Sequence, residues 1–244
     1  MKIAIVWYGR MWKLVEQHAL EKWDEISIII DPLKNTTIHD LVGVDFDVII
    51  EFCIPKVAME NLEFYANNNY RVIMATTGWY NNLTKVKEMF KNSNWALLWS
   101  GNFSLWVNLF WKILEKSSKI MNNFPDYDVF WHEYHHKNKT DSPSWTLINT
   151  WDIILNNIKR KNCIVTDTLK DRPIKDEELH LTSTRGWAIP WTHQIFFDSL
   201  FDTIEIKHTA RTRDWFAIWA IKCAEWLKDK QGYYEIKDFM KYIS

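Results

Sequence analysis

The side chains that could do acid–base chemistry are concentrated in one segment, residues 133–146, which reads EYHHKNKTDSPSWT. It contains two adjacent histidines, His135 and His136, and Lys139 follows shortly after them. Imidazole can donate or accept a proton near neutral pH, and a lysine ammonium adds a positive charge. The segment therefore predicts a site that brings acids and hydrogen-bond donors onto one anionic ligand.

The end of this segment predicts the start of a helix, with Trp145 and Thr146 in its first turn. Free backbone N–H groups and the helix dipole favour an anion at such a start, so a carboxylate could bind there. Zinc is the obvious rival for a histidine pair. However, adjacent histidines on a strand point to opposite faces, and no third ligand stands at a suitable spacing. A solvated basic loop stays open as another interpretation.

A second chemical pattern lies near the N-terminus, where the apolar run Ile3–Val6 predicts a strand that leads into a helix. With glycine at 7 and 12, the loop would hold a complete G-x-G-x-x-G dinucleotide fingerprint. Indole at 7 would fill the phosphate site, and indole at 12 would push the helix from the strand, so the loop as written should bind a dinucleotide poorly. The predicted cofactor contacts here are Trp7, Tyr8, Gly9, Arg10, Met11 and Trp12.

A carboxylate completes this nucleotide pattern. The predicted strand 26–30 ends at Asp31, about twenty residues after the loop, where an acid accepts hydrogen bonds from an adenosine ribose. Asp31 favours NAD, whereas Lys34 close behind it could serve the 2′-phosphate of NADP. Both NADH and NADPH are therefore candidate cofactors.

The composition has fewer glycines and more tryptophans than a chain of this length usually contains. Ordinary usage of about 7% glycine predicts roughly 17 glycines at this length, whereas the chain has 6 glycines and 16 tryptophans. Some bacteria read the codon UGA as glycine, and a common alternative code reads it as tryptophan. We hypothesise that many of these tryptophans are glycine codons read in the wrong code. UGG codons at 7, 12, 145 and 187 would refute this.

Charge and apolar patterning exclude several classes of protein. The 30 basic and 31 acidic residues balance, so no strong field predicts a nucleic acid or an anionic membrane as partner. No apolar run of about 18 residues and no signal peptide are visible. The three cysteines are far apart and fit a reduced compartment. We therefore expect a cytoplasmic protein without a metal centre.

The order of apolar runs predicts an α/β chain of two domains. Strands at 3–6, 26–30, 47–51, 71–75 and 95–99 should alternate with helices at about 10–22, 56–68 and 82–91, which indicates a Rossmann-like parallel sheet. We expect this dinucleotide-binding domain at 1–103, completed by helices within 216–244. The second domain, 104–215, should be α+β with an open mixed sheet. Its expected elements are helices at 105–121 and 145–158, a strand at 127–131 and further strands between 163 and 210.

These motifs together resemble the 4-hydroxy-tetrahydrodipicolinate reductase family of bacterial lysine and diaminopimelate biosynthesis, essentially end to end. The family pattern E-x-H-H-x-x-K-x-D-A-P-S-G-T matches residues 133–146, with Ser142 for alanine. The fingerprint at 7–12 and the segments 75–78, 100–104, 185–193 and 208–220 match as well. Most departures are tryptophans where the family has glycine: Trp7, Trp12, Trp23, Trp106, Trp145, Trp151, Trp187, Trp191 and Trp219. By contrast, Trp79 and Trp226 stand where an aromatic residue is natural.

The resemblance implies reduction of an unsaturated cyclic imine dicarboxylate to tetrahydrodipicolinate, with hydride from NADH or NADPH. It assigns His135 as acid or base and Lys139 as proton donor, with His136, Trp145 and Thr146 as substrate contacts. It adds cofactor contacts after two predicted strands, at Ala75, Thr76, Thr77, Ser100, Gly101, Asn102 and Phe103. Residues 104–215 would bind the substrate and join a homotetramer through their sheet.

Two rival functions stay open at this point. One is another Rossmann oxidoreductase that acts on an amino or imino acid. The other is a non-catalytic protein, either a degraded homologue or an aromatic-rich binding module, which gains weight if the tryptophans are genuine. Arg185, His193 and His208 could be structural or lie near the site. At the glycine positions we expect a positive φ or crowding at Trp7, Trp12, Trp187 or Trp191.

Overall fold

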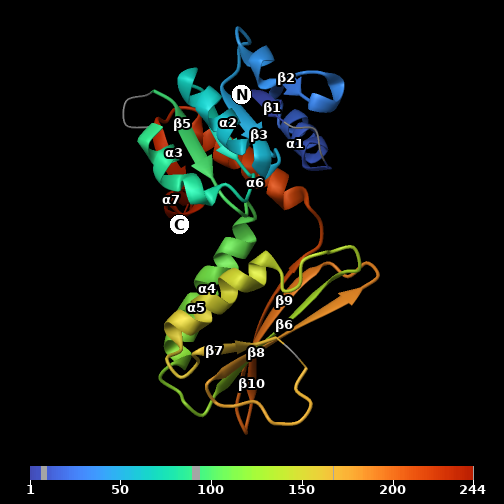
Figure 1. The fold of residues 1–244 in the computed structure, drawn as a ribbon, viewed down its shortest axis with the longest axis vertical. Coiled ribbons are helices and arrows are strands. Elements are labelled where there is room, and N and C mark those ends of the chain that lie inside the picture. The colour runs from blue at the N-terminus through green and yellow to red at the C-terminus, as the bar shows by residue number, and fades with distance from the viewer. Residues whose placement is uncertain (7–9, 90–93, 167, 244) are drawn as a thin grey trace. The chain divides into compact units, whose positions relative to one another are not determined.

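The computed structural model describes residues 1–6, 10–89, 94–166 and 168–243, without the side chains of Arg10 and Trp145. The chain divides into two compact units (Figure 1). Unit 1 consists of Met1–Leu105 and Arg213–Ser244, and unit 2 consists of Trp106–Thr212. Each unit has its own sheet and its own apolar core.

In its described residues, unit 1 contains a parallel six-stranded sheet in the order β11-β5-β4-β3-β1-β2. The strands are β1 (Lys2–Val6), β2 (Glu25–Ile30), β3 (Val48–Glu51), β4 (Arg71–Met74), β5 (Ala96–Trp99) and β11 (Gly232–Glu235). Strands β1, β3 and β4 are almost wholly buried, which explains why they form continuous apolar runs in the sequence. Because β1 lies between β2 and β3, the strand order reverses there, and ligands bind at such points.

Helices cover the sheet of unit 1. They are α1 (Arg10–Glu21), α2 (Pro55–Asn67), α3 (Leu83–Met89), α6 (Asp214–Leu227) and α7 (Ile236–Ile243). Leu62 of α2 and Val86 of α3 pack in one core with Ala4, Val6 and Ile49 of the strands. Helix α6 packs against α1, so the C-terminal segment joins the first half of the chain.

The strands and helices of this unit begin and end close to their expected residues, with one omission. Strand β11 was not expected, and it pairs with β5 at the edge of the sheet. Its sequence Gly-Tyr-Tyr-Glu is too short to show a period. The C-terminal segment therefore adds a strand to the sheet as well as helices.

Unit 2 has a mixed five-stranded sheet, in the order β10-β9-β6-β8-β7, within its described residues. The strands are β6 (Asp128–His136), β7 (Cys163–Val165), β8 (Glu178–Gly186), β9 (Trp191–Asp198) and β10 (Thr203–Ala210). Helices α4 (Leu105–Met121) and α5 (Trp145–Asn157) lie together against the sheet (Figure 1). Leu114 of α4 and Ile154 of α5 share a core with Val129 and Trp131 of β6.

One tryptophan occupies a backbone conformation that favours glycine. Trp23 has φ 63°, and its side chain is 95% exposed. Its N–H donates to the Leu20 carbonyl and the Asp24 N–H donates to the Ala19 carbonyl, each at 3.0 Å. This pair of bonds is the Schellman motif, whose left-handed residue is usually glycine. The backbone at 23 is therefore that of a glycine C-cap after α1.

Of the expected positive φ or crowding, a positive φ is absent at Trp12, Trp187 and Trp191. The described non-glycine residues with positive φ are Trp23, Asn35 and Asn69, so Trp12, Trp187 and Trp191 are not among them. Trp7 lies outside the described residues. Trp12 lies in helix α1, where any residue adopts a negative φ. At position 12 the expected role of glycine is close approach of the backbone, which requires no positive φ.

We predict that Trp23→Gly stabilises unit 1. An L-residue in the left-handed region costs about 1–2 kcal/mol, and glycine's extra freedom when unfolded offsets part of the gain. The free energy of unfolding in urea should rise by about 1 kcal/mol. As a control, Gln17→Gly at an exposed position inside α1 should lower it by about 1 kcal/mol. Equal losses from both substitutions would contradict the prediction.

Candidate active site

Strand β6 carries the paired histidines, because it continues to His136 instead of ending near residue 131 as expected. Burial alternates along the strand, so Trp131, Glu133 and His135 share the buried face and His136 lies on the other. Trp131 belongs to the core with α4 and α5, so Glu133 and His135 lie on the helix-covered side of the sheet. An acid and an imidazole are thereby placed inside unit 2.

The Glu133 carboxylate is fully buried and accepts hydrogen bonds from the start of α5 and from β8. Ser144 donates its backbone N–H to Oε1 at 3.2 Å and its hydroxyl to Oε2 at 2.5 Å. Ser183 donates its hydroxyl to Oε1 at 2.5 Å, and Arg185 Nη2 lies 3.4 Å from the same oxygen. These donors compensate a charge that would otherwise be costly to bury.

The expected helix start after the histidines is found at Trp145, with Ser144 as its N-cap. The Ser144 hydroxyl accepts the Leu147 N–H at 3.1 Å while it donates to Glu133. The first N–H groups of a helix, here those of Trp145 and Thr146, have no partner in the helix ladder and carry the positive end of its dipole. This helix start can therefore hold a carboxylate.

Two cationic side chains, Lys139 and Arg185, make contacts at the turn between β6 and α5. Lys139 Nζ contacts both carboxylate oxygens of Asp141, at 2.6 and 2.8 Å. Arg185 donates from Nη2 to the Asp141 carbonyl oxygen at 2.7 Å and lies opposite His135 in the β6–β8 register. The turn that carries Lys139 is thus tied to β8, and both positive charges act on His135.

His135 and His193 form a pair of buried imidazoles whose ring centres are 5.2 Å apart. Burial lowers the pKa of His135 to about 4, an effect that the Glu133 charge opposes and that Lys139 and Arg185 reinforce. Burial, followed by the neighbouring His135 and His208, lowers the pKa of His193 well below its ordinary value. Both rings are therefore neutral at pH 7 in the free protein and can accept protons.

Possible ligand atoms of Glu133, His135 and His193 all lie within 4.8 Å of one another. Spacing along the chain did not reveal His193 as a third ligand, because it comes from β9 and pairs with Glu133 across the sheet. The Glu133 oxygens, however, already accept hydroxyl and N–H groups and face the Arg185 guanidinium. These contacts favour proton chemistry over cation binding at the cluster.

The expected nucleotide residues follow the carboxyl ends of the strands in unit 1. Asp31 follows β2 and is 3% exposed, and its Oδ1 accepts the Leu33 N–H at 3.0 Å. A cavity of about 470 Å³ lies next to it, lined by Val6, Ile30, residues 35–39 and one side of α2. Because this cavity lies at the reversal of strand order, it is the candidate pocket for the nucleoside part of a dinucleotide.

The fingerprint loop is described only in part. Trp7, Tyr8 and Gly9 lie outside the described residues, and Arg10, Met11 and Trp12 form the first turn of α1. Trp12 is 5% exposed. A helix that starts directly behind β1 is the arrangement a dinucleotide fingerprint requires.

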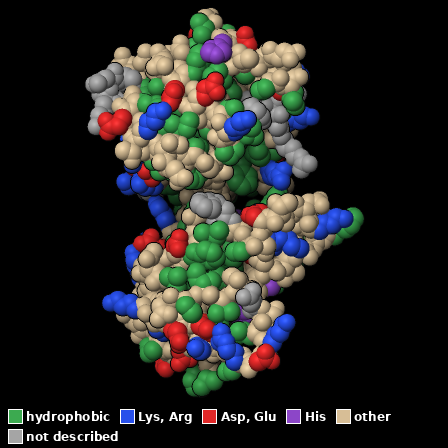
Figure 2. Space-filling model, in the orientation of Figure 1, with side chains coloured by type: hydrophobic (Ala, Val, Ile, Leu, Met, Phe, Trp, Pro, Cys, Tyr) green, Lys and Arg blue, Asp and Glu red, His purple; other side chains and the backbone are tan. Residues whose placement is uncertain are grey.

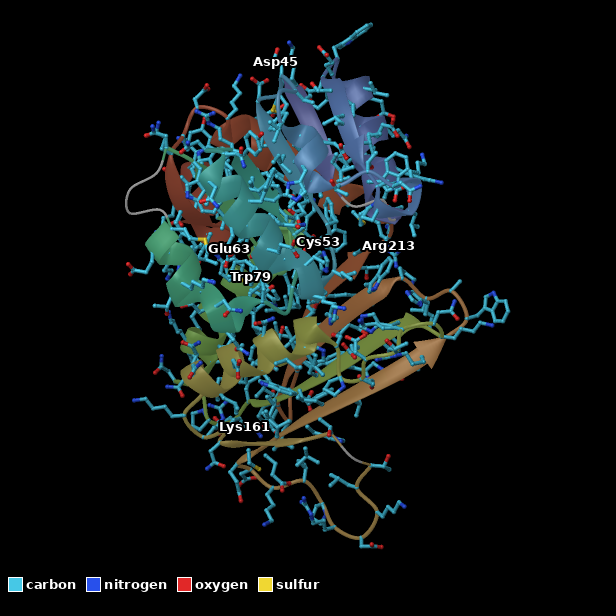
Figure 3. The ribbon with its side chains drawn as sticks, turned by 45° about the horizontal axis from the view of Figure 1, so that its top comes forward. Asp45, Cys53, Glu63, Trp79, Lys161 and Arg213 are labelled. Carbon is cyan, nitrogen blue, oxygen red and sulfur yellow. The ribbon has the colours of Figure 1, made fainter. Side chains whose placement is uncertain are left out.

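The loops after β4 and β5 are held by their own hydrogen bonds. Thr76 donates its hydroxyl to the Cys53 carbonyl at 3.0 Å, and Trp79 Nε1 donates to the Thr76 carbonyl at 2.8 Å; Cys53 and Trp79 are labelled in Figure 3. After β5, the Ser100 hydroxyl accepts the Asn102 N–H at 3.0 Å. The other expected contacts in these loops are Ala75, Thr77, Gly101 and Phe103.

The surface shows no concentration of one charge on the face drawn in Figure 2, where basic and acidic side chains are mixed. In the part of the chain that the structure describes, no helix is long and apolar enough to cross a membrane.

Comparisons with known proteins give a consistent result. Residues 1–103 match the family model "Dihydrodipicolinate reductase, N-terminus", and residues 106–240 match "Dihydrodipicolinate reductase, C-terminus". The chain is 35% identical over 242 residues to the 4-hydroxy-tetrahydrodipicolinate reductase of Christiangramia forsetii, covering 98% of each chain. It is 34% identical over 208 residues to that of Archaeoglobus fulgidus, covering 83% of this chain and 79% of the relative.

Solved structures show the same fold. A dipicolinate-bound dihydrodipicolinate reductase from Paenisporosarcina sp. TG-14 superimposes with a TM-score of 0.76 at 16% identity, covering 96% of this chain and 97% of the other. An amine dehydrogenase from Mycobacterium smegmatis gives 0.57 at 10% identity, covering 95% and 93%. Since both family models and the full-length relative agree, the chain belongs to the dihydrodipicolinate (4-hydroxy-tetrahydrodipicolinate) reductase family.

Proposed function

We propose that the chain reduces 4-hydroxy-tetrahydrodipicolinate to tetrahydrodipicolinate with hydride from a nicotinamide cofactor, a step of lysine and diaminopimelate biosynthesis. The curated relatives are named for this reductase activity. The observation that carries the proposal is the gathering of His135, the Lys139 turn and the start of α5 around Glu133. Such a site suits a dicarboxylate that must also receive a proton.

Substrate binding follows from the charges of this site. The first turn of α5 offers the N–H groups of Trp145 and Thr146 to one carboxylate. Lys139 is the proposed partner for the rest of the substrate, and charge-assisted hydrogen bonds to carboxylates are among the stronger ones. His136 is a proposed substrate contact on the family resemblance alone, because it lies on the face of β6 opposite to His135. The structural neighbour is bound to dipicolinate, itself a dicarboxylate, which makes that compound a suitable test ligand here.

Reduction requires a hydride on one atom of the unsaturated system and a proton on its neighbour. When bound, the nicotinamide supplies the hydride. Lys139 is the proposed proton donor because its Nζ carries N–H donors and is held at the turn by the Asp141 carboxylate. His135 is neutral in the free protein, and the negative charge of a bound dicarboxylate raises its pKa, so that it becomes an acid or base in the complex.

The cofactor of this family's N-terminal domain is a pyridine nucleotide, and we propose that NADH is preferred over NADPH. The buried Asp31 carboxylate follows β2, where it can accept the ribose hydroxyls and repels a 2′-phosphate. Lys34 lies in the short helix that Asp31 caps and leaves NADPH usable. The remaining cofactor contacts are the loops at 7–12, 75–77 and 100–103.

The tryptophans bear directly on activity, because indoles at 7, 12 and 145 would stand where backbone must approach an anion. We propose that the active polypeptide carries glycine there. With genuine tryptophan, a non-catalytic homologue becomes the better interpretation. The glycine-type C-cap at Trp23 supports the first alternative, since its backbone favours glycine without reference to any ligand.

We also propose a cytoplasmic location and a homotetramer joined through the sheet of unit 2. Phe130 and Phe196 stack at 4.7 Å on the sheet face opposite to the helices, and Phe130 is 37% exposed. An apolar pair on an open sheet face suits contact with a second copy.

The first prediction is loss of turnover without loss of fold in His135→Gln. Removing a general acid or base lowers turnover by about 100-fold or more. NADH oxidation with freshly generated substrate measures it. His132→Gln is the matched control, because His132 lies on the other face of β6 and bonds to Thr182 and Thr184. Equal activity of both variants would remove His135 from the mechanism, and an inactive glycine-containing parent would count against the reductase itself.

The second prediction concerns cofactor choice. Asp31→Asn removes the charge that repels a 2′-phosphate, so the ratio of kcat/KM for NADPH over NADH should rise about tenfold, or about 1.4 kcal/mol. Asp45→Asn changes an exposed acid, whose side chain is 83% exposed, and should leave the ratio unchanged. An unchanged ratio in Asp31→Asn would show that this carboxylate does not select the cofactor.

The third prediction tests the glycine positions. Trp7→Gly combined with Trp12→Gly should raise NADH affinity about tenfold or more, because the phosphate can then reach the helix N-terminus. Trp79→Gly is the control and should not improve binding, since Trp79 is 2% exposed and packs against Tyr80 and Trp99. Mass spectrometry of the native protein decides the same question: indoles at 7 and 12 in a protein that binds NADH tightly would refute the hypothesis.

A further inference from the structure

Glu133 has no part in the proton chemistry proposed above, yet its carboxylate contacts the start of α5, strand β8 and His135. The side chain is completely buried in β6, and neither oxygen lacks a donor. A buried carboxylate is stable only when its charge is met by well-placed donors. The position of Glu133 therefore constrains the groups that surround it.

The first constraint acts on the anion-binding helix start. Ser144 gives both its backbone N–H and its hydroxyl to Glu133, and the same hydroxyl caps α5 through the Leu147 N–H. The orientation of the first turn of α5 is thus set by a carboxylate on the neighbouring strand. If the Glu133 carboxylate is lost, the Ser144 N-cap loses the hydrogen bonds that fix its position.

The second constraint acts on the turn that carries Lys139. Arg185 is shared between Glu133 Oε1, at 3.4 Å, and the Asp141 carbonyl, at 2.7 Å. Asp141 in turn holds the Lys139 ammonium. A chain of polar contacts therefore leads from Glu133 to the proposed proton donor.

The third effect is electrostatic and acts on His135. The Nδ1 atoms of His135 and His193 lie 3.7 Å from Oε1 and Oε2 of Glu133, respectively. Among the described residues neither Nδ1 has a hydrogen-bond partner. At 3.7 Å these contacts are electrostatic and are too long for hydrogen bonds. Catalytic contacts that are long in a free enzyme often shorten when the substrate is bound.

We propose that Glu133 is the positioning residue of the site, which holds the α5 start, the Lys139 turn and the His135 imidazole in one reactive arrangement. This inference rests on the proposed function. Glu133 does not touch the substrate; it acts through Ser144, Arg185 and His135.

The test is Glu133→Gln, with Glu177→Gln as the matched control because Glu177 is an exposed acid in the same unit. A glutamine side chain has one acceptor oxygen and one NH2 group, so it cannot accept the Ser144 hydroxyl at one position and the Ser183 hydroxyl at the other. Dipicolinate affinity and kcat should therefore each fall at least about tenfold. NADH affinity should stay within about twofold, since the nucleotide residues belong to unit 1. Calorimetry and steady-state kinetics measure these quantities.

A pH profile separates positioning from mere structural support. The Glu133 charge raises the pKa of His135, so the acidic limb of kcat/KM should move to lower pH in Glu133→Gln and stay in place in Glu177→Gln. An unmoved limb together with dipicolinate affinity within about twofold of wild type would overturn the proposal.

Ser183→Ala covers the case in which Glu133→Gln does not fold. It keeps the carboxylate but removes the donor at 2.5 Å, and dipicolinate affinity should fall about threefold; unchanged affinity overturns the proposal. The variants are made in the chain with glycine at 7, 12 and 145, and this parent chain is measured first. If it neither binds dipicolinate nor oxidises NADH with substrate, the proposed function fails. If it does both and the variants match it, only the role of Glu133 fails.

Discussion

The buried charge of Glu133 is the constraint on which the chemistry of unit 2 depends. Placing a carboxylate in the core is costly unless donors meet it, and the donors come from the N-cap of α5 and from β8. Those elements cannot shift without leaving the charge unpaired. Folding and site assembly therefore share one interaction, and the helix start that we propose to bind a carboxylate is already held by the Ser144–Glu133 contacts in the free protein.

The same burial controls the imidazoles. A low-dielectric surrounding favours the neutral ring, so His135 stands uncharged between an acid and two cations. A bound dicarboxylate would add further negative charge near His135 and raise the pKa of its ring. Proton uptake by His135 would then be coupled to substrate binding, and water or a monoanion would not charge the ring to the same degree.

The sequence predicted the positions of individual strands and helices well, and the pairing between strands poorly. Continuous apolar runs located β1 to β5, and helix α4 begins and ends at the expected residues. Strand β6 was predicted to end too early. Glu133 and His135 are polar, so the sequence did not reveal that they lie on a buried face of the strand. Their spacing of two residues was the available signal. His193 could not be placed beside them, since its pairing with Glu133 depends on the register of β9, which no local pattern specifies.

The environments of Trp79 and Trp23 indicate, without reference to function, at which of the two positions a tryptophan fits the fold. Trp79 is buried, donates a hydrogen bond and packs against two rings, as a natural aromatic does. Trp23 is almost wholly exposed and sits in the left-handed position of a Schellman motif. An indole gains nothing there, and glycine alone avoids the strain. The backbone at 23 favours glycine for conformational reasons, and the proposed ligand contacts favour bare backbone at 7, 12 and 145, so the proposed decoding error would account for both sets of positions.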